Sequence, residues 1–394
     1  MKCKLGMSLP IFLLLWYVTP SLVMVFFNQT SLSTGILLVS VTLFLFKNLT
    51  YRVSPLFLVF FLSLGMCSLI SIFFESNVKS VYSILVLLFI SVSLFSVLND
   101  LSKKNAGFSC SGIRNIYSIF IVIGVLGVFR LLEFGAYSGK AYPVPPFSEH
   151  SHFALAFAPI SIYIQLACYS KIKKLFIAIV PLLFGVAFPS LVFMILAFIQ
   201  LMLVDKKSCF YYFSLLAVLL SVVIFSENES MEYFRGRILF DSSDPNLSNL
   251  VYLQGWENAY IALKETSFIG LGFQNNGMQQ PGTIGNLIFN IYGGDLNRLD
   301  GGFLASKIIS EFGFFGILFF SFFIFSTIYL WWKCFDERFE SNSQLNVLFY
   351  SLSFSLLIEI MFRGYGYFSP TFILYITSAA FILSKKLSVG ASYA

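Results

Sequence analysis

Residues 147–155 read FSEHSHFAL and hold the only two histidines of the chain, His150 and His152, beside Glu149. A carboxylate and an imidazole are the side chains that most often act as general bases. Partial burial that raised the pKa of Glu149 would suit it to deprotonating a hydroxyl, with His150 or His152 orienting it or replacing it. The alternative is an ordinary helix start, capped by Ser148 or Glu149, with both histidines facing water. Two histidines two positions apart point to different helix faces, which disfavours a metal site.

An apolar run follows these residues, and the whole chain is apolar. Hydrophobic residues make up 58% of the 394 residues and charged residues 11%, against about 25% charged in a soluble domain. The mean hydropathy is +0.84. Runs of about 17–25 apolar residues recur, each long enough to cross a bilayer as a helix. We therefore expect an all-α polytopic membrane protein, a single integral membrane domain over 1–394.

Twelve membrane spans are predicted, and the first is expected to be a retained anchor rather than a signal peptide. The motif FPS at 188–190 is expected to form a tight turn between two short spans. The predicted spans are 7–27, 31–46, 53–74, 81–98, 115–134, 151–168, 175–188, 190–204, 209–225, 303–330, 343–362 and 366–384.

Lysine-rich loops follow the even-numbered spans, so the positive-inside rule places both termini in the cytoplasm. Most cations then fix topology, and the net charge of +6 does not indicate nucleic acid as a partner. No cysteine falls in an outer loop, so no disulfide framework is implied. The outer face receives a short loop at 135–150 and a long one at 226–302, and loops of that length are usually functional.

Five arginines fall on the outer side, where topology disfavours cations: Arg130, Arg235, Arg237, Arg298 and Arg363. The guanidinium fork binds phosphate in a bidentate manner. This bias predicts a phosphate-bearing ligand at the outer membrane surface. In the alternative, the arginines pair with acids, for example Arg130 with Glu133 and Arg363 with Glu359.

Within the long loop, residues 248–265 have helical periodicity and are expected to lie over the outer mouth. Ser248 or Asn249 is expected to cap this helix, and GLGFQNNG (270–277) to supply turns. Trp256 is a candidate for stacking on a sugar ring, although aromatic side chains are also ordinary at a membrane interface. The apolar stripe is predicted to contain Leu250, Leu253, Trp256, Tyr260 and Leu263.

Three stretches resemble the Wzy-type O-antigen polymerases of Gram-negative inner membranes, as does the general layout of the chain. PPFSEHSHFAL is similar to the family's Phe-x-Glu-Pro-Ser-His-Phe-Ala helix start, with His150 where proline is common. NLVYLQGWENAYIALKETSFIGLGFQNNG is similar to its loop segment that ends in Gly-x-Gly-Phe-Gln. DGGFLASKIISEFGFFG is similar to the junction with the next span.

The resemblance implies a glycosyltransferase of the periplasmic face. It would transfer a glycan from undecaprenyl pyrophosphate to another lipid-linked repeat unit and release the lipid pyrophosphate. Glu149 and His152 match the helix-start motif, whereas Arg235, Arg237 and Arg298 are candidates by loop position. The motif DSSD (241–244) has no compelling metal-ligand spacing, so we expect arginines to stabilise the leaving group without metal or cofactor.

The resemblance also implies partners and leaves two alternatives. The partners are lipid-linked oligosaccharides, the bilayer and, within the same pathway, a chain-length regulator and a flippase. An O-antigen ligase has similar architecture, but ligases commonly carry a histidine late in the long loop, and this chain has none after His152. A flippase needs polar groups at mid-depth and usually internal repeats, and neither is evident.

Overall fold

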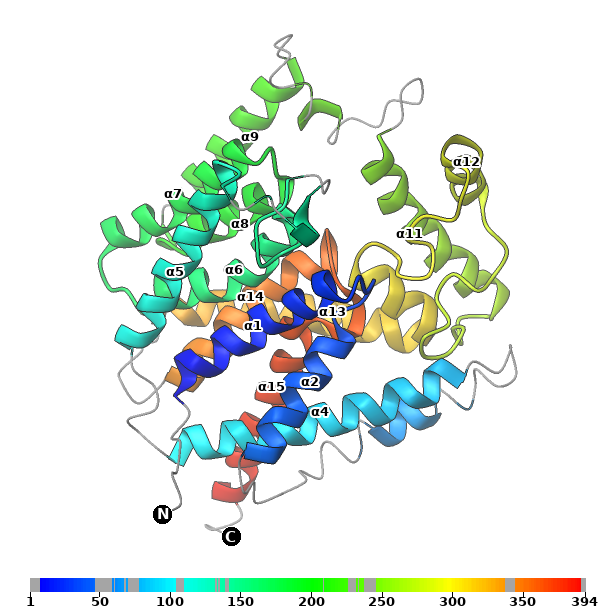
Figure 1. The fold of residues 1–394 in the computed structure, drawn as a ribbon, viewed down its shortest axis with the longest axis horizontal. Helices are drawn as coiled ribbons and strands as arrows, with labels where there is room; N and C mark the ends of the chain where they lie inside the picture. The colour runs from blue at the N-terminus through cyan, green and yellow to red at the C-terminus, as the bar shows by residue number, and fades with distance from the viewer. Residues whose placement is uncertain are drawn as a thin grey trace.

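The computed structural model describes most of the chain, and its described residues form an all-α protein (Figure 1). The first half comprises α1 (Leu9–Phe26), α2 (Ser33–Phe46), α4 (Val78–Lys103), α5 (Cys110–Val128), the short η2 (Gly135–Tyr137), α6 (His150–Leu166) and α7 (Lys171–Ala187). The second half comprises α8 (Leu191–Met202), α9 (Cys209–Phe225), α11 (Leu247–Glu265), α12 (Thr283–Tyr292), α13 (Leu304–Asp336), α14 (Gln344–Met361), η4 (Gly366–Phe368) and α15 (Pro370–Gly390). The described residues are 8–46, 59, 61–66, 69, 78–103, 110–131, 133, 135–138, 142–207, 209–225, 232, 234–236, 246–336 and 344–390.

Five helices of the described residues are long and apolar enough to cross a membrane: α1, α4, α5, α13 and α14. α2, α8 and α15 contain shorter apolar stretches. A helix occupies each predicted span except 53–74, which lies mostly outside the described residues. The structure therefore supports a membrane protein, and the number of crossings stays a prediction.

The centre of the fold is α6, which packs against α14. Fifteen of its seventeen residues, from Ser151 to Leu166 apart from His152, are buried. A helix that is apolar all round must be covered by neighbours, and α5, α7 and α8 also pack around it. α14 is buried over most of its length. The start of α6 and the end of α14 meet, which brings residues around 149 and 363 together.

Phenylalanine rings fix the start of α6. Phe147 and Phe153 are fully buried and contact each other, with ring centroids 5.5 Å apart. Phe184 and Phe188, where α7 ends, and Phe193 on α8 pack against Phe153. Phe188 ends α7 and Ser190 precedes α8, so the turn predicted at FPS is confirmed.

α13 is kinked at Gly313, whose φ of 56° and ψ of −127° are not helical. At 1.5 Å per residue its 33 residues would span about 50 Å, more than the ~30 Å hydrocarbon core. The kink releases the carbonyls of Ser310 and Glu311, which accept hydrogen bonds from Leu271 and Gly272 at 3.0 and 2.9 Å. The segment that follows α11 is thereby joined to the first turns of α13.

The predicted loop helix is confirmed as α11, but its cap and buried face differ from the prediction. The Asn246 side chain caps it, accepting a hydrogen bond from the Ser248 N–H at 2.9 Å. Leu250 is buried as expected, whereas Tyr260 is 66% exposed. The buried face is instead small and polar, and includes Gln254, Gly255 and Asn258. Asn258 Nδ2 donates to the Arg298 carbonyl at 3.4 Å, and a side chain at Gly255 would collide with the Gly301 carbonyl, so this face accepts small and polar residues.

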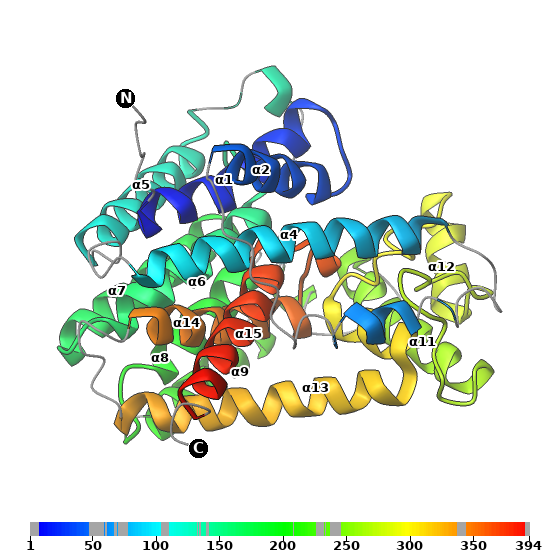
Figure 2. The ribbon, with the colours of Figure 1, turned by 90° about the horizontal axis from the view of Figure 1, so that it is seen from below.

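α12 was not predicted from the sequence, because its ten residues are short and contain Gly285. The Glu257 carboxylate on α11 accepts hydrogen bonds from the Ile284 and Gly285 N–H groups at 3.0 and 3.1 Å. A carboxylate at a helix N-terminus accepts hydrogen bonds from N–H groups that have no partner within the helix. Its negative charge is also attracted to the positive end of the helix dipole. Figure 2 shows α11 and α12 at the end of the molecule where α4 and α13 begin.

Candidate active site

A cavity of about 1000 Å³ lies where six segments meet. Its walls come from the α1–α2 connection, the start of α4, the residues before and at the start of α6, the turn at Gln274, the segment before α13 with its first turn, and the α14–α15 connection. The polar lining includes Ser148, Glu149, His152, Lys79, Asn297, Asp300, Lys307 and Arg363. All of these residues were predicted to lie on the outer side or at outer helix ends.

Glu149 is the centre of a hydrogen-bonded group in this cavity. Its Oε1 accepts from the Arg363 guanidinium at 2.8 Å, from His152 Nε2 at 2.9 Å and from the Ser151 hydroxyl at 2.5 Å. The alternative based on helical spacing paired Arg363 with Glu359. In the structure Arg363 pairs with Glu149 instead. Glu149 and Arg363 retain 33% and 37% of their side-chain exposure, so both face the cavity.

The pKa of Glu149 is lowered, not raised as we expected from partial burial. Burial does raise it, but the hydrogen bond from His152, the attraction of the imidazole when it is protonated and the charge of Arg363 outweigh that effect. An opposite charge at hydrogen-bond distance favours the ionised carboxylate. Glu149 is thus an anion that orients its neighbours, and it is a weaker base than the sequence indicated.

His152 lies between two partners. Its Nε2 contacts Glu149, and its Nδ1 is 2.7 Å from the Ser148 hydroxyl oxygen. The Tyr365 ring packs on the imidazole, with centroids 4.4 Å apart. Burial raises the pKa of Tyr365, so that phenol stays neutral. The imidazole is held on three sides in a defined orientation, as a base must be.

Lys307 and Lys79 contribute positive charge to the same cavity, and neither was among the predicted site residues. The Lys307 side chain is only 4% exposed, and its Nζ is 3.7 Å from an Asp300 carboxylate oxygen. Its Nζ is also 3.4 Å from the Leu299 carbonyl and 5.5 Å from the Tyr367 ring, and its charge attracts the buried Glu311 carboxylate. These are long contacts for a nearly buried ammonium. The sequence did contain a signal for Lys307. A lysine in the first turn of an apolar membrane-spanning helix is costly, and such residues are usually functional.

Glu311, one turn after Lys307, ties the cavity walls together. Its two oxygens accept from the Asn276 N–H at 3.2 Å and the Tyr367 hydroxyl at 2.7 Å. The Ser310 hydroxyl in turn donates to the Asn276 side chain at 2.7 Å. These bonds join α13, the GLGFQNNG turns and η4, so this carboxylate is structural.

His150 and Arg130 do not line the cavity. His150 stacks on Phe188, with centroids 6.1 Å apart, and meets the edge of Tyr142. As expected, the two histidines point in different directions. Arg130 is 3.6 Å from Glu133, as in the alternative based on pairing, and lies over the Tyr142 ring. The cavity therefore receives only one of the two histidines.

The predicted loop candidates lie elsewhere. Arg298 pairs with Asp295 at 2.9 Å and also donates to the Gln279 carbonyl, which supports the turn before α13. Trp256 packs on Phe303, with centroids 5.1 Å apart, and holds α11 to the start of α13. Arg235 lies in a short described stretch and is not part of the lining, and Arg237 lies outside the described residues.

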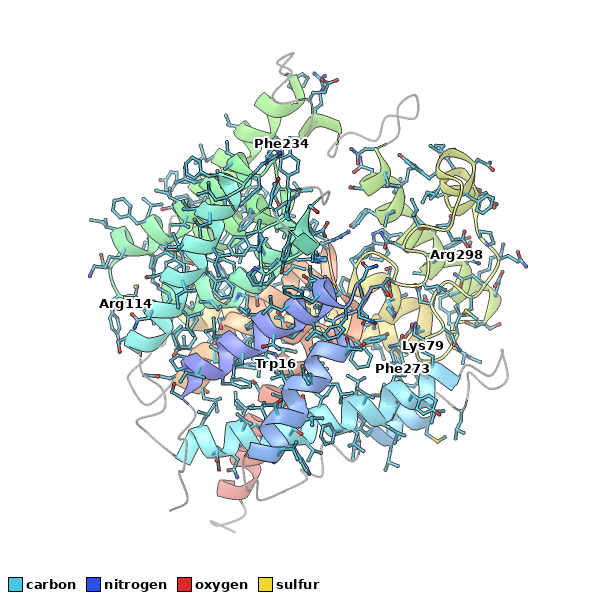
Figure 3. The ribbon with its side chains drawn as sticks, viewed as in Figure 1. Trp16, Lys79, Arg114, Phe234, Phe273 and Arg298 are labelled. Atoms are coloured by element: carbon cyan, nitrogen blue, oxygen red, sulfur yellow. The ribbon has the colours of Figure 1, made fainter. Side chains whose placement is uncertain are left out.

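The opposite end of the molecule has its own polar contacts. Lys171 pairs with Asp205 at 2.9 Å, and the Trp331 indole donates to the Met202 carbonyl. Figure 3 shows Arg114, predicted to be cytoplasmic, far from Lys79 and Arg298, which were predicted to be outside. These three residues are thus separated in space, whichever side faces the cytoplasm. No group of three or more potential metal-binding side chains occurs in the described part of the chain.

Comparison with protein-family models, curated proteins and solved structures finds no match to this chain.

Proposed function

We propose that this protein is a Wzy-type polymerase that joins lipid-linked oligosaccharide repeat units. The observation that carries the proposal is one cavity that holds an oriented Glu149–His152 pair together with the cations Arg363, Lys307 and Lys79. Glycan transfer from a lipid diphosphate needs these two functions, a proton acceptor for the attacking hydroxyl and positive charge for the departing diphosphate.

The charge of the cavity supports a diphosphate ligand. Three cations, Arg363, Lys307 and Lys79, face two carboxylates, Glu149 and Asp300, which leaves a net charge of +1 with His152 neutral. Asp300 is 67% exposed, so its attraction to Lys307 is screened by solvent. Glu311 also attracts the Lys307 ammonium, but Lys307 lines the cavity and can contact an incoming anion.

In the proposed reaction, the acceptor hydroxyl loses its proton to the Glu149–His152 pair while its oxygen bonds to the anomeric carbon of the donor. The bond between that carbon and the phosphate oxygen breaks, and the lipid pyrophosphate leaves with both bonding electrons. Arg363 and the two lysines stabilise the charge that develops on it. The bilayer holds both lipid substrates near the cavity and supplies proximity.

The proposed setting is the bacterial inner membrane, with twelve spans, both termini in the cytoplasm and the cavity at the periplasmic face. The long apolar helices support the membrane location, and the loop lysines support the orientation. A single cysteine at position 150 or 235, in a background free of native cysteines, should react with an impermeant reagent added from outside. Protection at both positions would reverse the orientation and rule out periplasmic chemistry.

The decisive experiment incubates the purified protein in vesicles with lipid-linked repeat units and resolves the products by size. Polymerisation produces a ladder of multiples and releases lipid pyrophosphate. Transfer to lipid A core without lengthening would indicate a ligase, and altered sidedness without lengthening would indicate a flippase. Arg130→Gln is the control variant, because Arg130 pairs with Glu133 outside the cavity.

A further inference from the structure

We infer that the Ser148 hydroxyl forms part of the proton path, and that it connects the acceptor hydroxyl to His152. This inference rests on the proposed function and assigns a residue that the sequence suggested only as a helix cap. Ser148 lines the cavity beside Glu149 and His152. Glu149, not Ser148, occupies the cap position of α6.

The hydrogen bonds around His152 determine which of its ring nitrogens carries the proton. An ionised carboxylate can only accept, so the contact of 2.9 Å between Glu149 and His152 Nε2 places the imidazole proton on Nε2. In a neutral ring Nδ1 is then an acceptor, and its contact of 2.7 Å with Ser148 requires the hydroxyl to donate. The Ser148 oxygen keeps its lone pairs for another donor, and an acceptor hydroxyl in the cavity is such a donor.

Glu149 is a poorer alternative for the first proton transfer. One of its oxygens already accepts three hydrogen bonds, from Arg363, His152 and Ser151. Donors to an ionised carboxylate weaken it as a base. Its role in this arrangement is to orient the imidazole and to stabilise the positive charge that His152 gains.

The backbone before α6 holds Ser148 in place. Val144 and Phe147 exchange two backbone hydrogen bonds, of 3.2 and 2.7 Å, and both side chains are fully buried. The next residue is Ser148, so its position is fixed by a closed turn rather than by a free loop. A group held this way needs little reorganisation during proton transfer.

The step balances as follows. The acceptor hydroxyl gives its proton to the Ser148 oxygen while its own oxygen bonds to the anomeric carbon. The original Ser148 proton passes to His152 Nδ1, which leaves an imidazolium paired with Glu149. The bond from the anomeric carbon to the phosphate oxygen breaks, and the lipid pyrophosphate leaves. The imidazolium then returns its proton to water, and Ser148 is unchanged.

The test compares Ser148→Ala, which removes the hydroxyl, with Ser148→Thr, which retains it. General-base contributions are typically about 10²–10⁴-fold. For Ser148→Ala we expect kcat for repeat-unit joining to fall at least about tenfold, with KM for the lipid-linked substrate nearly unchanged. Ser148→Thr should recover most of kcat. Ser118→Ala is the matched control, because Ser118 is exposed on α5 and bonds only to the Arg114 carbonyl among its recorded contacts.

Three outcomes would overturn the relay. The first is an unchanged kcat in Ser148→Ala, and the second is a loss confined to KM, which would indicate a binding role. The third is a glycan covalently attached to Ser148, which mass spectrometry would detect and which would make this serine a nucleophile. A wild-type protein that makes no ladder would instead remove the proposed function itself, so the two failures are distinguishable.

If Ser148→Ala does not fold, as judged by its unfolding temperature, a second measurement tests the relay. This measurement is the solvent deuterium isotope effect on kcat of the wild-type protein. A kcat that is the same in light and heavy water counts against the relay.

Discussion

Arg363 and Glu149 are 214 positions apart in the sequence, yet their side chains meet at 2.8 Å. The contact forms because α14 ends where α6 begins, and those two helices form the buried centre of the protein. The guanidinium has five donors in a fixed fork, and the Glu149 bond uses one of its terminal nitrogens. Arg363 can therefore orient Glu149 and still present N–H groups to an anion in the cavity.

We expect Arg363→Gln to lose most of the polymerising activity, by about 100-fold or more, because loss of one preorganised donor to a developing charge has effects of that size. Arg363→Lys keeps the charge but not the fork, and should recover only part of the activity. The ladder assay measures both variants, and Arg130→Gln serves as the control. Equal loss in Arg130→Gln and Arg363→Gln would show that the effect is not specific to the cavity.

Lys307 provides a separate test of the diphosphate site. Lys307→Met removes the ammonium but retains most of the apolar volume, so the packing of α13 should survive. We expect KM for the lipid-linked donor to rise at least about tenfold, because a partly desolvated charge contact to phosphate is lost. Binding of undecaprenyl pyrophosphate alone should weaken in parallel.

The matched control for that variant is Lys264→Met, near the end of α11 in the same outer segment. Lys264 is exposed and does not line the cavity. An increase in KM for this control equal to that of Lys307→Met would mean that general surface charge, rather than Lys307, attracts the substrate.

Local signals in the sequence predicted much of the fold and three of the polar residues that line the candidate site. Apolar runs predicted the helices, FPS predicted the turn between α7 and α8, and periodicity predicted α11. Glu149 and His152 were found because histidine is rare here, and Arg363 because arginine is disfavoured outside. None of these signals depends on how the helices pack.

The missed features all depend on packing between distant segments. Helical spacing offered Glu359 to Arg363, but the meeting of α6 with α14 supplies Glu149 instead. Arg298 was a candidate for ligand binding, but the fold brings the Gln279 carbonyl, 19 residues away, to its guanidinium, which also pairs with Asp295. Lys307 becomes part of a site only when the segments around Asp300 and Tyr367 close over it.

The lowered pKa of Glu149 predicts how its contribution to stability depends on pH. A carboxylate with a lowered pKa in the folded state stabilises that state above the ordinary pKa of 4.5, and this contribution is lost as the pH falls from there towards the folded value. We expect the difference in unfolding temperature between wild type and Glu149→Gln not to diminish between neutral pH and 4.5, and to diminish below it. The groups facing Glu149 are Arg363, His152, Ser151 and Tyr365. Between neutral pH and 4.5, any charge that the imidazole gains enlarges the difference in unfolding temperature. If the difference in unfolding temperature already vanished above pH 4.5, the lowered pKa of Glu149 would be contradicted.

Gly313 tests whether the kink in α13 holds the outer segment in place. A Cβ at this position would collide with the backbone of Phe268 and Ile269, and the φ of 56° already disfavours other residues. We expect Gly313→Ala to destabilise the protein by roughly 2 kcal/mol or more, since a left-handed conformation costs about 1–2 kcal/mol before any clash. The backbone movement that relieves this collision should separate the α13 carbonyls from the Leu271 and Gly272 N–H groups and reduce the yield of the ladder.

The control is Gly293→Ala. Gly293 shares the left-handed φ, but a Cβ there meets open space, so this variant should cost only about 1 kcal/mol. Equal losses of stability in both variants would show that the close approach at Gly313 contributes nothing, and that the outer segment is held by other contacts.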